Sequence, residues 1–521
     1  MTEPQGRASY PLLVALVVAM GGFLMGFDSA VISGVVDPVR AEFKLTADEV
    51  GWAVACLTLG STIAMAFAGP LADRLGRKRV LMATAALFTV SAIGSALAPS
   101  NLILVIARIV GGFGVGGALL IAPIYIAEIA PPAQRGRLVS FNQLNIVLGF
   151  SAAFFSNYFL EGAGMSWRWM LGVEAIPAVL YLVLLTLVPE SPRWLAGQGH
   201  DARALAVLER VNGPSAAATA LRSMKESLAQ ARNQSRARLS DIFNKRMRRV
   251  MVIALGLGFF QQITGINAIF YYSTTIFAMA GAARDIALGH AILVGLVNVF
   301  FTLIAMRLID RAGRKPLLLV GTAVMTAALF TNAAAFSAAK YRMSVDTVDK
   351  LSAIDSPLPP EAVAALRAVQ DREFGDQLEF NAALRAAAAE QGPTAVAAIG
   401  GKLEDLAKDA LEINGLLVLI AICGFIAGFA ISLGPVMWAM FSEIFPTHLR
   451  GLAISVAGFF NSAVSFGVQQ LFPRGMETLG PAGVFAIFGS FAALAFLFTI
   501  FIIPETKGRT LEELEALLVR D

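Results

Sequence analysis

Long apolar runs alternate with short polar breaks along almost the whole chain. About 20 apolar residues in a helix are needed to cross a hydrocarbon core about 30 Å thick, so each run predicts one membrane-spanning helix. Twelve spans are predicted, at residues 10–35, 50–71, 80–98, 101–124, 139–160, 169–188, 250–278, 286–309, 316–338, 414–441, 451–472 and 483–503. The pattern therefore predicts an all-α membrane protein with 12 transmembrane helices.

Two long polar segments interrupt the spans, and their charges differ in sign. Segment 190–249 holds 12 Lys and Arg against 5 Asp and Glu, which predicts a cytoplasmic helical linker by the positive-inside rule. Segment 340–412 holds 8 against 13 and falls on the opposite face if both termini are cytoplasmic. Its many alanines and its breaks at SPLPP and QGP predict short helices. We favour a tolerated extracytoplasmic insert; a lid or partner surface is the alternative.

Three motifs occur twice, once in each half of the chain. DRLGRK at residue 73 recurs as DRAGRK at 310, EIAPPAQRG at 128 as EIFPTHLRG at 443, and PESPR at 189 as PETKG at 504. This repetition indicates two duplicated halves. Membrane proteins with parallel halves of this kind bind substrate between the halves, near the bilayer midplane. The predicted segments are an N-terminal six-helix half (1–189), the linker (190–249), the first part of the C-terminal half (250–339), the insert (340–413), the rest of that half (414–503) and a cytoplasmic tail (504–521).

The composition supports a membrane protein and argues against other classes. Apolar residues make up 57% of the chain and charged residues only 15%, whereas soluble domains carry about 25% charged residues. The net charge of +4 comes from basic residues gathered in short segments such as 73–79 and 310–315. These segments orient helices and do not indicate nucleic-acid binding. The three histidines are scattered, so we expect no enzyme, metal or cofactor.

Eight motifs spread over nearly the whole chain resemble those of the sugar porter branch of the major facilitator superfamily. They are GFDSAVISG, GPLADRLGRK, PIYIAEIAPPAQRG, PESPRWL, QQITGINAIFYY, DRAGRK, GPVMWAMFSEIFP and PETKG; segment 340–412 lies outside the resemblance. The resemblance implies two pseudo-symmetric six-helix halves and a monosaccharide transporter working by alternating access, as a monomer, in a bacterial inner membrane. Sugar:proton symport is the favoured mode. A passive facilitator and a non-transporting sugar sensor are the alternatives.

The motif QQITGIN places three amides, Gln261, Gln262 and Asn267, within two turns of a span expected to be helical. Amides in hydrocarbon are costly unless paired. They either join helices or, as we favour, bind uncharged hydroxyls, since an amide both donates and accepts. The resemblance implies a hexose or pentose site formed by Gln143, Gln261, Gln262, Asn267, Asn298 and Trp438, with Gly434, Tyr271 and Asn461 beside them. Met25, Phe150 and Ser462 depart from residues frequent in the family, so the resemblance does not define the sugar.

Charged residues repeat at the predicted cytoplasmic ends of both halves. The resemblance implies ion pairs of an inside gate formed by Arg77, Glu128 and Arg135 in one half and by Asp310, Arg314, Glu443 and Arg450 in the other. Topology alone is the competing explanation. It requires only Lys and Arg, so the matched acids favour the gate.

Asp28 lies inside the first predicted span and Arg108 inside the fourth. Intramembrane charges usually face a polar interior and a partner. The proton affinity of an acid depends on its burial and on the distance to a nearby arginine, so a distance that changes between two states couples protons to transport. The resemblance implies this role for Asp28 and Arg108. A static buried ion pair is the alternative.

Overall fold

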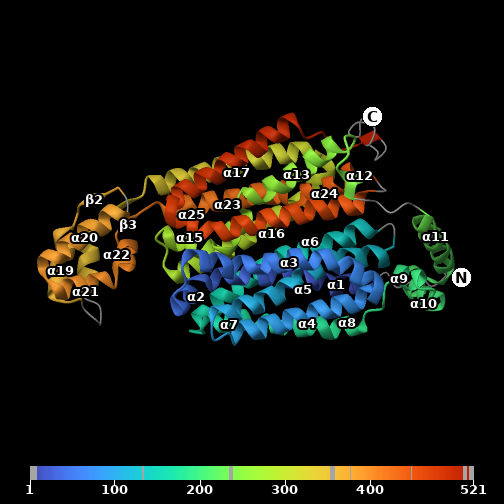
Figure 1. Cartoon of the computed structure of the whole chain (residues 1–521), viewed down its shortest axis with the longest axis horizontal. Coiled ribbons are helices and arrows are strands. Elements are labelled where there is room, and N and C mark those ends of the chain that lie inside the picture. The colour runs from blue at the N-terminus through green and yellow to red at the C-terminus, as the bar shows by residue number, and fades with distance from the viewer. Residues whose placement is uncertain are drawn as a thin grey trace.

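The computed structural model describes residues 9–131, 134–233, 239–352, 358–375, 377–446, 449–508 and 513–514. Its long helices form one bundle (Figure 1). A small domain projects beyond one end of the bundle, and short helices lie at the other end. We call these the insert end and the linker end, after residues 340–413 and 190–249.

The N-terminal half contains long apolar helices joined by short loops. Its elements are α1 (Ser9–Val31), η1 (Ile32–Gly34), α2 (Val36–Phe43), α3 (Ala47–Leu75), α4 (Arg77–Ala96), α5 (Asn101–Ile129), α6 (Arg135–Gly162), α7 (Trp167–Gly172) and α8 (Ala175–Leu187). The helix α3 begins with a complete capping box, in which Thr46 and Glu49 satisfy each other's backbone N–H groups. Such reciprocal bonds fix the start of a helix.

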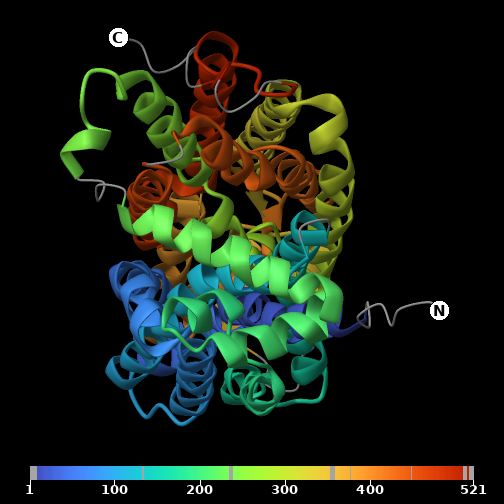
Figure 2. The same cartoon turned by 90° about the vertical axis from the view of Figure 1, so that its right-hand side faces the viewer.

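The C-terminal half repeats this plan with more interruptions. Its elements are α13 (Arg248–Ile263), α14 (Ile266–Tyr271), α15 (Ser273–Met279), α16 (Arg284–Ala312), α17 (Arg314–Ser337), α23 (Gly415–Ile431), α24 (Leu433–Ile444) and α25 (Arg450–Phe501). Figure 2 looks onto the linker end and shows the blue and cyan helices of the first half below the yellow-to-red helices of the second. The two halves therefore lie side by side, as the repeated motifs predict.

The last helix, α25, contains two membrane crossings. Its 52 residues would extend about 78 Å as one helix, more than twice the thickness of a hydrocarbon core. Gly480 interrupts it with φ 68° and ψ 168°, between the predicted spans 451–472 and 483–503. Eleven stretches of the described chain are long and apolar enough to span a membrane. With α25 counted as two, the twelve predicted crossings are confirmed.

Short elements form the linker and the insert. The linker holds α9 (Pro192–Gly197), α10 (Asp201–Asn212), α11 (Pro214–Asn233) and α12 (Leu239–Ile242). The insert holds α18 (Val345–Ser352), α19 (Pro360–Ala368), α20 (Gln377–Gln391), α21 (Pro393–Gly400) and α22 (Leu403–Asp409), with β1 (Lys340–Arg342), β2 (Glu373–Phe374) and β3 (Leu411–Glu412). The predicted short helices are present, whereas the antiparallel sheet in the order β2-β1-β3 is an addition.

Hydrophobic burial separates the insert from the bundle. Eighteen buried residues of the insert, including Met343, Phe380 and Leu384, form a cluster of their own. The linker behaves differently, because Leu195, Ala204 and other residues of α9 and α10 belong to the core of the N-terminal half. The insert therefore has its own core, while the linker packs on the bundle.

The expected helix through QQITGIN is interrupted in the structure. The helix α13 ends at Ile263 and α14 starts at Ile266, because Gly265 adopts a left-handed conformation with φ 90°. A Cβ at this position would also overlap the ring of Phe488. Residues 414–441, predicted as one span, break similarly at Ser432, between α23 and α24. Broken helices are a recurrent way to build binding sites inside transporters.

Candidate functional site

A cavity lies between the two halves, and all nine residues predicted to bind sugar line it. These residues are Gln143, Gln261, Gln262, Asn267, Tyr271, Asn298, Gly434, Trp438 and Asn461. They come from α6 of the first half and from α13, α14, α16, α24 and α25 of the second. Trp438 keeps 40% of its surface exposed, so an indole face is available inside the bundle.

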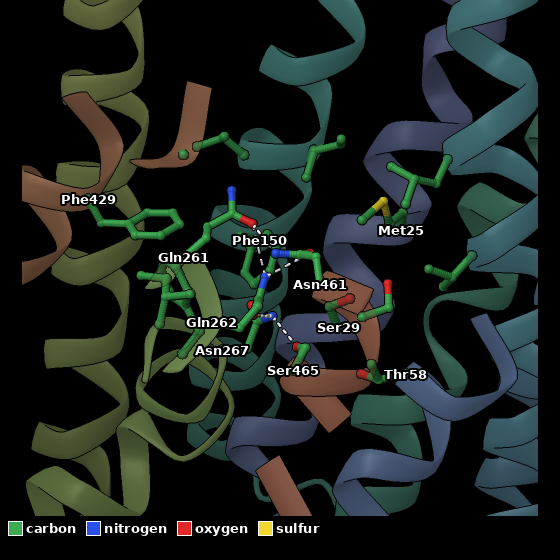
Figure 3. A pocket seen from close by; sticks show the side chains of 18 of the residues that line it. Met25, Ser29, Thr58, Phe150, Gln261, Gln262, Asn267, Phe429, Asn461 and Ser465 are labelled. Carbon is green, nitrogen blue, oxygen red and sulfur yellow. Dashed lines mark hydrogen bonds between the residues drawn. The ribbon is translucent and has the colours of Figure 1, made fainter. Parts of the chain in front are cut away.

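The amides on the wall of the C-terminal half are bonded to one another (Figure 3). The Nε2 atom of Gln262 donates to Gln261 Oε1 at 3.1 Å and to Asn461 Oδ1 at 3.3 Å. Asn461 Nδ2 donates to Gln261 Oε1 at 2.8 Å, and Asn267 Nδ2 donates to Gln262 Oε1 at 2.9 Å. The break at Gly265 brings Asn267 back toward Gln262. Because these amides already bond to one another, the hydroxyls of a ligand must replace existing hydrogen bonds.

The backbone anchors the network at two points. Gln261 Nε2 donates to the carbonyl of Leu433, at the start of α24, at 3.0 Å. Asn461 Nδ2 donates to the carbonyl of Gly258 at 2.8 Å. Gly434 follows Leu433, and a Cβ there would lie 3.1 Å from Phe429. The lack of a side chain at this position therefore permits the close packing of α24 against α23.

The facing wall, from the N-terminal half, is mostly apolar. Met25, Ile146, Val147 and Phe150 line it, and the ring of Phe150 packs on that of Phe270 with centroids 4.9 Å apart. Two of these, Met25 and Phe150, are the departures noted in the sequence. The cavity thus combines one wall rich in amides with one mostly apolar wall, which carries Gln143.

Asp28 and Arg108 lie together beside this cavity. Arg108 Nη1 lies 3.4 Å from Asp28 Oδ1, and both side chains are at least 97% buried. A separation of 3.4 Å is longer than most charge-assisted hydrogen bonds. Asp28 Oδ2 and Arg108 Nε have no hydrogen-bond partner among the described residues. The neighbouring Ser29 lines the cavity, so the ion pair is one residue away from the candidate sugar site.

Glu174 is a third charged group near this pair, and it was absent from the sequence prediction. It lies between α7 and α8, is 2% exposed, and has Asp28 and Arg108 as electrostatic neighbours. Its Oε1 atom has no hydrogen-bond partner within the described part of the chain. Its signal in the sequence is the same as that of Asp28, an acid inside an apolar run.

The charged clusters at the linker end are duplicated in detail. Arg77 Nε lies 3.1 Å from Glu128 Oε2, and Ser191 Oγ donates to Glu128. The carboxylate of Glu190 accepts the backbone N–H groups of Arg77 and Lys78 at 2.9 and 3.1 Å. It therefore caps α4 where the helix dipole favours an anion.

The second half repeats these contacts. Arg314 Nη2 lies 2.7 Å from Glu443 Oε1, Thr506 Oγ1 donates to Glu443, and Glu505 caps α17 through the N–H groups of Arg314 and Lys315. The capping role of Glu190 and Glu505 was not predicted, although PESPR and PETKG mark their positions.

Each described pair of the predicted gate lies within one half. Rigid-body rotation of the halves would therefore leave Arg77–Glu128 and Arg314–Glu443 intact. Arg450 Nε donates to the carbonyl of Phe445 at 3.3 Å, also within its half. The side chains of Arg135 and Asp310 lie outside the described part of the structure.

Polar contacts between the halves occur near the insert end. Arg40 pairs with Glu477 at 2.8 Å, and Arg284 pairs with Glu161. Further contacts run from Thr275 to Asp37, from Gln470 and Arg474 to Asp48, from Arg284 to the carbonyl of Gly34 and from Thr58 to Gln469. The structure is thus held together across the halves at the insert end.

The chain resembles known sugar transporters over almost its full length. Residues 14–347 and 394–518 match the family described as "Sugar (and other) transporter". The arabinose-proton symporter of Bacillus subtilis is 33% identical, with 98% of this chain and 96% of that protein covered. The glucose transport protein of Synechocystis is 32% identical, with 98% of both covered. The inward open conformation of the xylose transporter XylE from E. coli has a TM-score of 0.74 at 31% identity, covering 98% of this chain and 100% of that one.

Proposed function

The chain belongs to the sugar porter family of the major facilitator superfamily, and we propose that it carries a monosaccharide together with a proton by alternating access. Membership of a transporter family makes it a sugar transporter rather than an enzyme.

The chemistry of the cavity supports a monosaccharide. Amides such as Gln261, Gln262 and Asn461 offer donors and acceptors without charge, as sugar hydroxyls require. Trp438 offers an apolar face for the carbon–hydrogen side of a sugar ring. Relatives of similar length carry arabinose or glucose in their names, in agreement with a small sugar.

The charge of the linker supports an orientation in the membrane, and the contacts between the halves support an inward-facing state. The basic linker, with 12 Lys and Arg against 5 Asp and Glu, favours a cytoplasmic linker end, which puts both termini inside and the insert outside a bacterial inner membrane. The contacts between the halves at the insert end, such as Arg40–Glu477, close the outer side. The likeness to an inward open transporter agrees with a cavity that faces the cytoplasm.

The observation that carries the proton coupling is the buried pair of Asp28 and Arg108 beside the cavity. A charged pair removed from water is costly unless well compensated, yet this pair is long and leaves Asp28 Oδ2 without a partner in the described residues. Ser29, adjacent to Asp28, lines the cavity together with Tyr271 of the other half. A movement between the halves therefore acts directly on the segment that holds the acid.

Asp28→Asn tests the coupling in proteoliposomes, because it keeps the shape of the side chain and removes its titration. We expect lost sugar-driven proton uptake and lost accumulation, with sugar counterflow retained. Proton uptake that continues in this variant would contradict the coupling. Wild-type protein that equilibrates sugar without proton uptake would instead identify a passive facilitator, and wild-type protein that binds sugar without counterflow would identify a sensor.

A further inference from the structure

Gln469 is a buried amide outside the cavity lining. It lies on α25 with no exposed surface, about two helical turns beyond Asn461. Its Nε2 donates to Ser465 Oγ at 2.8 Å, and its Oε1 accepts a hydrogen bond from Thr58 Oγ1 at 2.9 Å. Both ends of the amide are therefore engaged at the boundary between two helices.

Ser465 joins Gln469 to the candidate sugar site. Its hydroxyl oxygen also accepts a bond from Asn267 Nδ2 at 2.8 Å, and Asn267 donates in turn to Gln262 Oε1. Figure 3 shows the bond between Asn267 and Ser465 below the amides, with Thr58 on the facing side. A continuous series of hydrogen bonds thus runs from the amides of the cavity to Thr58.

Thr58 is where this series crosses to the other half. It belongs to α3, whereas the amides and Ser465 belong to the C-terminal half. Within the described residues, the Thr58–Gln469 bond is the crossing point of the series. Separation of α3 from α25 would break it and replace it by bonds to water. A hydrogen bond between two protein groups contributes about 0.5–1.5 kcal/mol net of the bonds to water that it replaces, so the bond favours the state in which the insert end is closed.

Tyr272, between α14 and α15, also contacts this part of α25. The carbonyl of Gln469 accepts a bond from Tyr272 OH at 3.4 Å, and the ring of Tyr272 stacks on Phe472 with centroids 4.9 Å apart. Tyr272 begins the segment after α14, next to the broken helix that carries Asn267. The position of Gln469 therefore depends on the same segment that shapes the sugar site.

We propose that Gln469 is a positioning residue that links occupancy of the sugar site to closure of the insert end. A sugar that takes hydrogen bonds from Asn267 and Gln262 changes the bonding of Ser465, and Gln469 transmits this change to Thr58. A ligand shifts a conformational equilibrium only if it binds the two states with different free energy, and this series supplies the difference. The inference rests on the proposed sugar transport.

Spin labels on the two sides of the insert end measure the closed-to-open ratio, which is the population of molecules closed at that end divided by the population open there. Ala41 and Thr478 are exposed and adjoin the Arg40–Glu477 ion pair, so Ala41→Cys and Thr478→Cys report its separation without replacing it. The background carries Cys56→Ala and Cys423→Ala, which remove the two native thiols. Pulsed electron resonance on the purified full chain then gives the distance distribution with and without arabinose, xylose and glucose.

Thr58→Val and Gln469→Leu remove the bond from either side. We expect each to lower the sugar-free closed-to-open ratio about fivefold to tenfold, the effect of one buried hydrogen bond, and to weaken the response of the ratio to sugar. In the double variant Thr58→Val should add little to Gln469→Leu, because the two residues share one bond. Thr58→Ser, which keeps the hydroxyl, should restore the wild-type ratio.

Thr62→Val is the matched control, because Thr62 lies about one helical turn after Thr58, is buried, and donates its hydroxyl to the carbonyl of Thr58 in the same helix. It should keep the wild-type ratio. Unchanged ratios in Thr58→Val and Gln469→Leu, or fully additive effects, would overturn the inference. Thr62→Val behaving like Thr58→Val would do so too. If the wild-type ratio responds to none of the sugars, the proposed function fails. The ratios measured without sugar still test whether Gln469 contributes to closure.

Discussion

At the scale of single residues, the polar side chains inside this bundle differ in how completely they are paired. The amides of Gln261, Gln262 and Asn461 bond to one another and to backbone carbonyls. Among the charged groups, Asp28 and Glu174 each keep a carboxylate oxygen without a partner in the described residues. Fully paired groups stabilise one arrangement, whereas unpaired charges are sensitive to a proton or to movement. The charges are therefore better suited to coupling than the amides.

Glu174→Gln should reduce sugar-driven proton uptake by about tenfold, a change of 1.4 kcal/mol, while counterflow stays close to that of the wild type. The substitution keeps the size of the side chain and removes a buried acid that has Asp28 and Arg108 as electrostatic neighbours. Proton fluxes in proteoliposomes measure the effect. Glu209→Gln, an exposed acid in the linker, is the control and should change nothing. Equal proton uptake in the two variants would exclude Glu174 from the coupling.

At the scale of elements, breaks in helices and pairing of short strands determine where the chain turns. Gly265 breaks the helix that carries the amides, and Gly480 divides α25 into two crossings. In the insert, β1 and β3 pair antiparallel, with Lys340 opposite Glu412. The chain thus leaves and re-enters the bundle at adjacent points. An insert with its own core and adjacent ends is a separable element.

Replacement of residues 341–411 by Asn-Gly should leave transport unchanged. Lys340 and Glu412 face each other across an antiparallel pair, where Cα atoms lie about 5 Å apart, so a two-residue turn closes the gap. Uptake kinetics and membrane abundance of the shortened chain provide the measurement. A chain joined by a longer Gly-Ser linker controls for strain in the turn. Well-folded chains of both kinds that no longer transport would give the insert a part in the cycle.

Gly480→Ala should destabilise the protein by about 1–3 kcal/mol, since φ 68° and ψ 168° is a conformation open almost only to glycine. A Cβ there would meet no atom within 4 Å, so the effect comes from the backbone alone. A thermal melt in detergent measures the loss as a lower melting temperature. Gly467→Ala, also in open space but helical, should not lower it. Equal melting temperatures of the two variants would contradict a strained turn at Gly480.

At the scale of the whole molecule, the two halves meet closely at the insert end. Gly51 of α3 packs against the backbone of α25, where a Cβ would overlap the carbonyl of Gln470. Salt bridges such as Arg40–Glu477 lie in the same region, but exposed pairs each contribute only about 0–1 kcal/mol. Close packing of the backbones is therefore the more stringent requirement for closure.

Gly51→Ala should shift the protein toward the state that is open at the insert end, because the added methyl group meets backbone atoms that cannot rotate away. The spin-label pair at Ala41 and Thr478 measures the shift as a larger population of long distances, with slower counterflow. Gly69→Ala lies on the same helix and would meet only the side chain of Leu120 at 3.7 Å, so its distances should match the wild type. A wild-type distance distribution in Gly51→Ala would show that this contact does not limit closure.

Much of the architecture follows from the sequence because the bilayer restricts which backbone structures can cross it. A helix must satisfy its own backbone in hydrocarbon, so runs of apolar residues define twelve crossings, and repeated motifs define two halves. The same restriction makes polar residues inside spans conspicuous, which is why Gln261, Asn267, Asp28 and Arg108 could be singled out. The break at Gly265 could not be predicted in this way. Neither could the sheet of the insert, since strands of two or three residues carry no periodic signal.

The sequence by itself determined the fold class, the duplicated halves and the residue types that gather in the cavity, because hydrophobicity and polarity act through local composition. Only the tertiary structure decided which of these groups touch. It brought Glu174 to Asp28 and Thr58 to Gln469, and it confined the described Arg77–Glu128 and Arg314–Glu443 pairs to single halves. Distances between residues far apart in the chain depend on how all the helices pack together, and no local pattern encodes them.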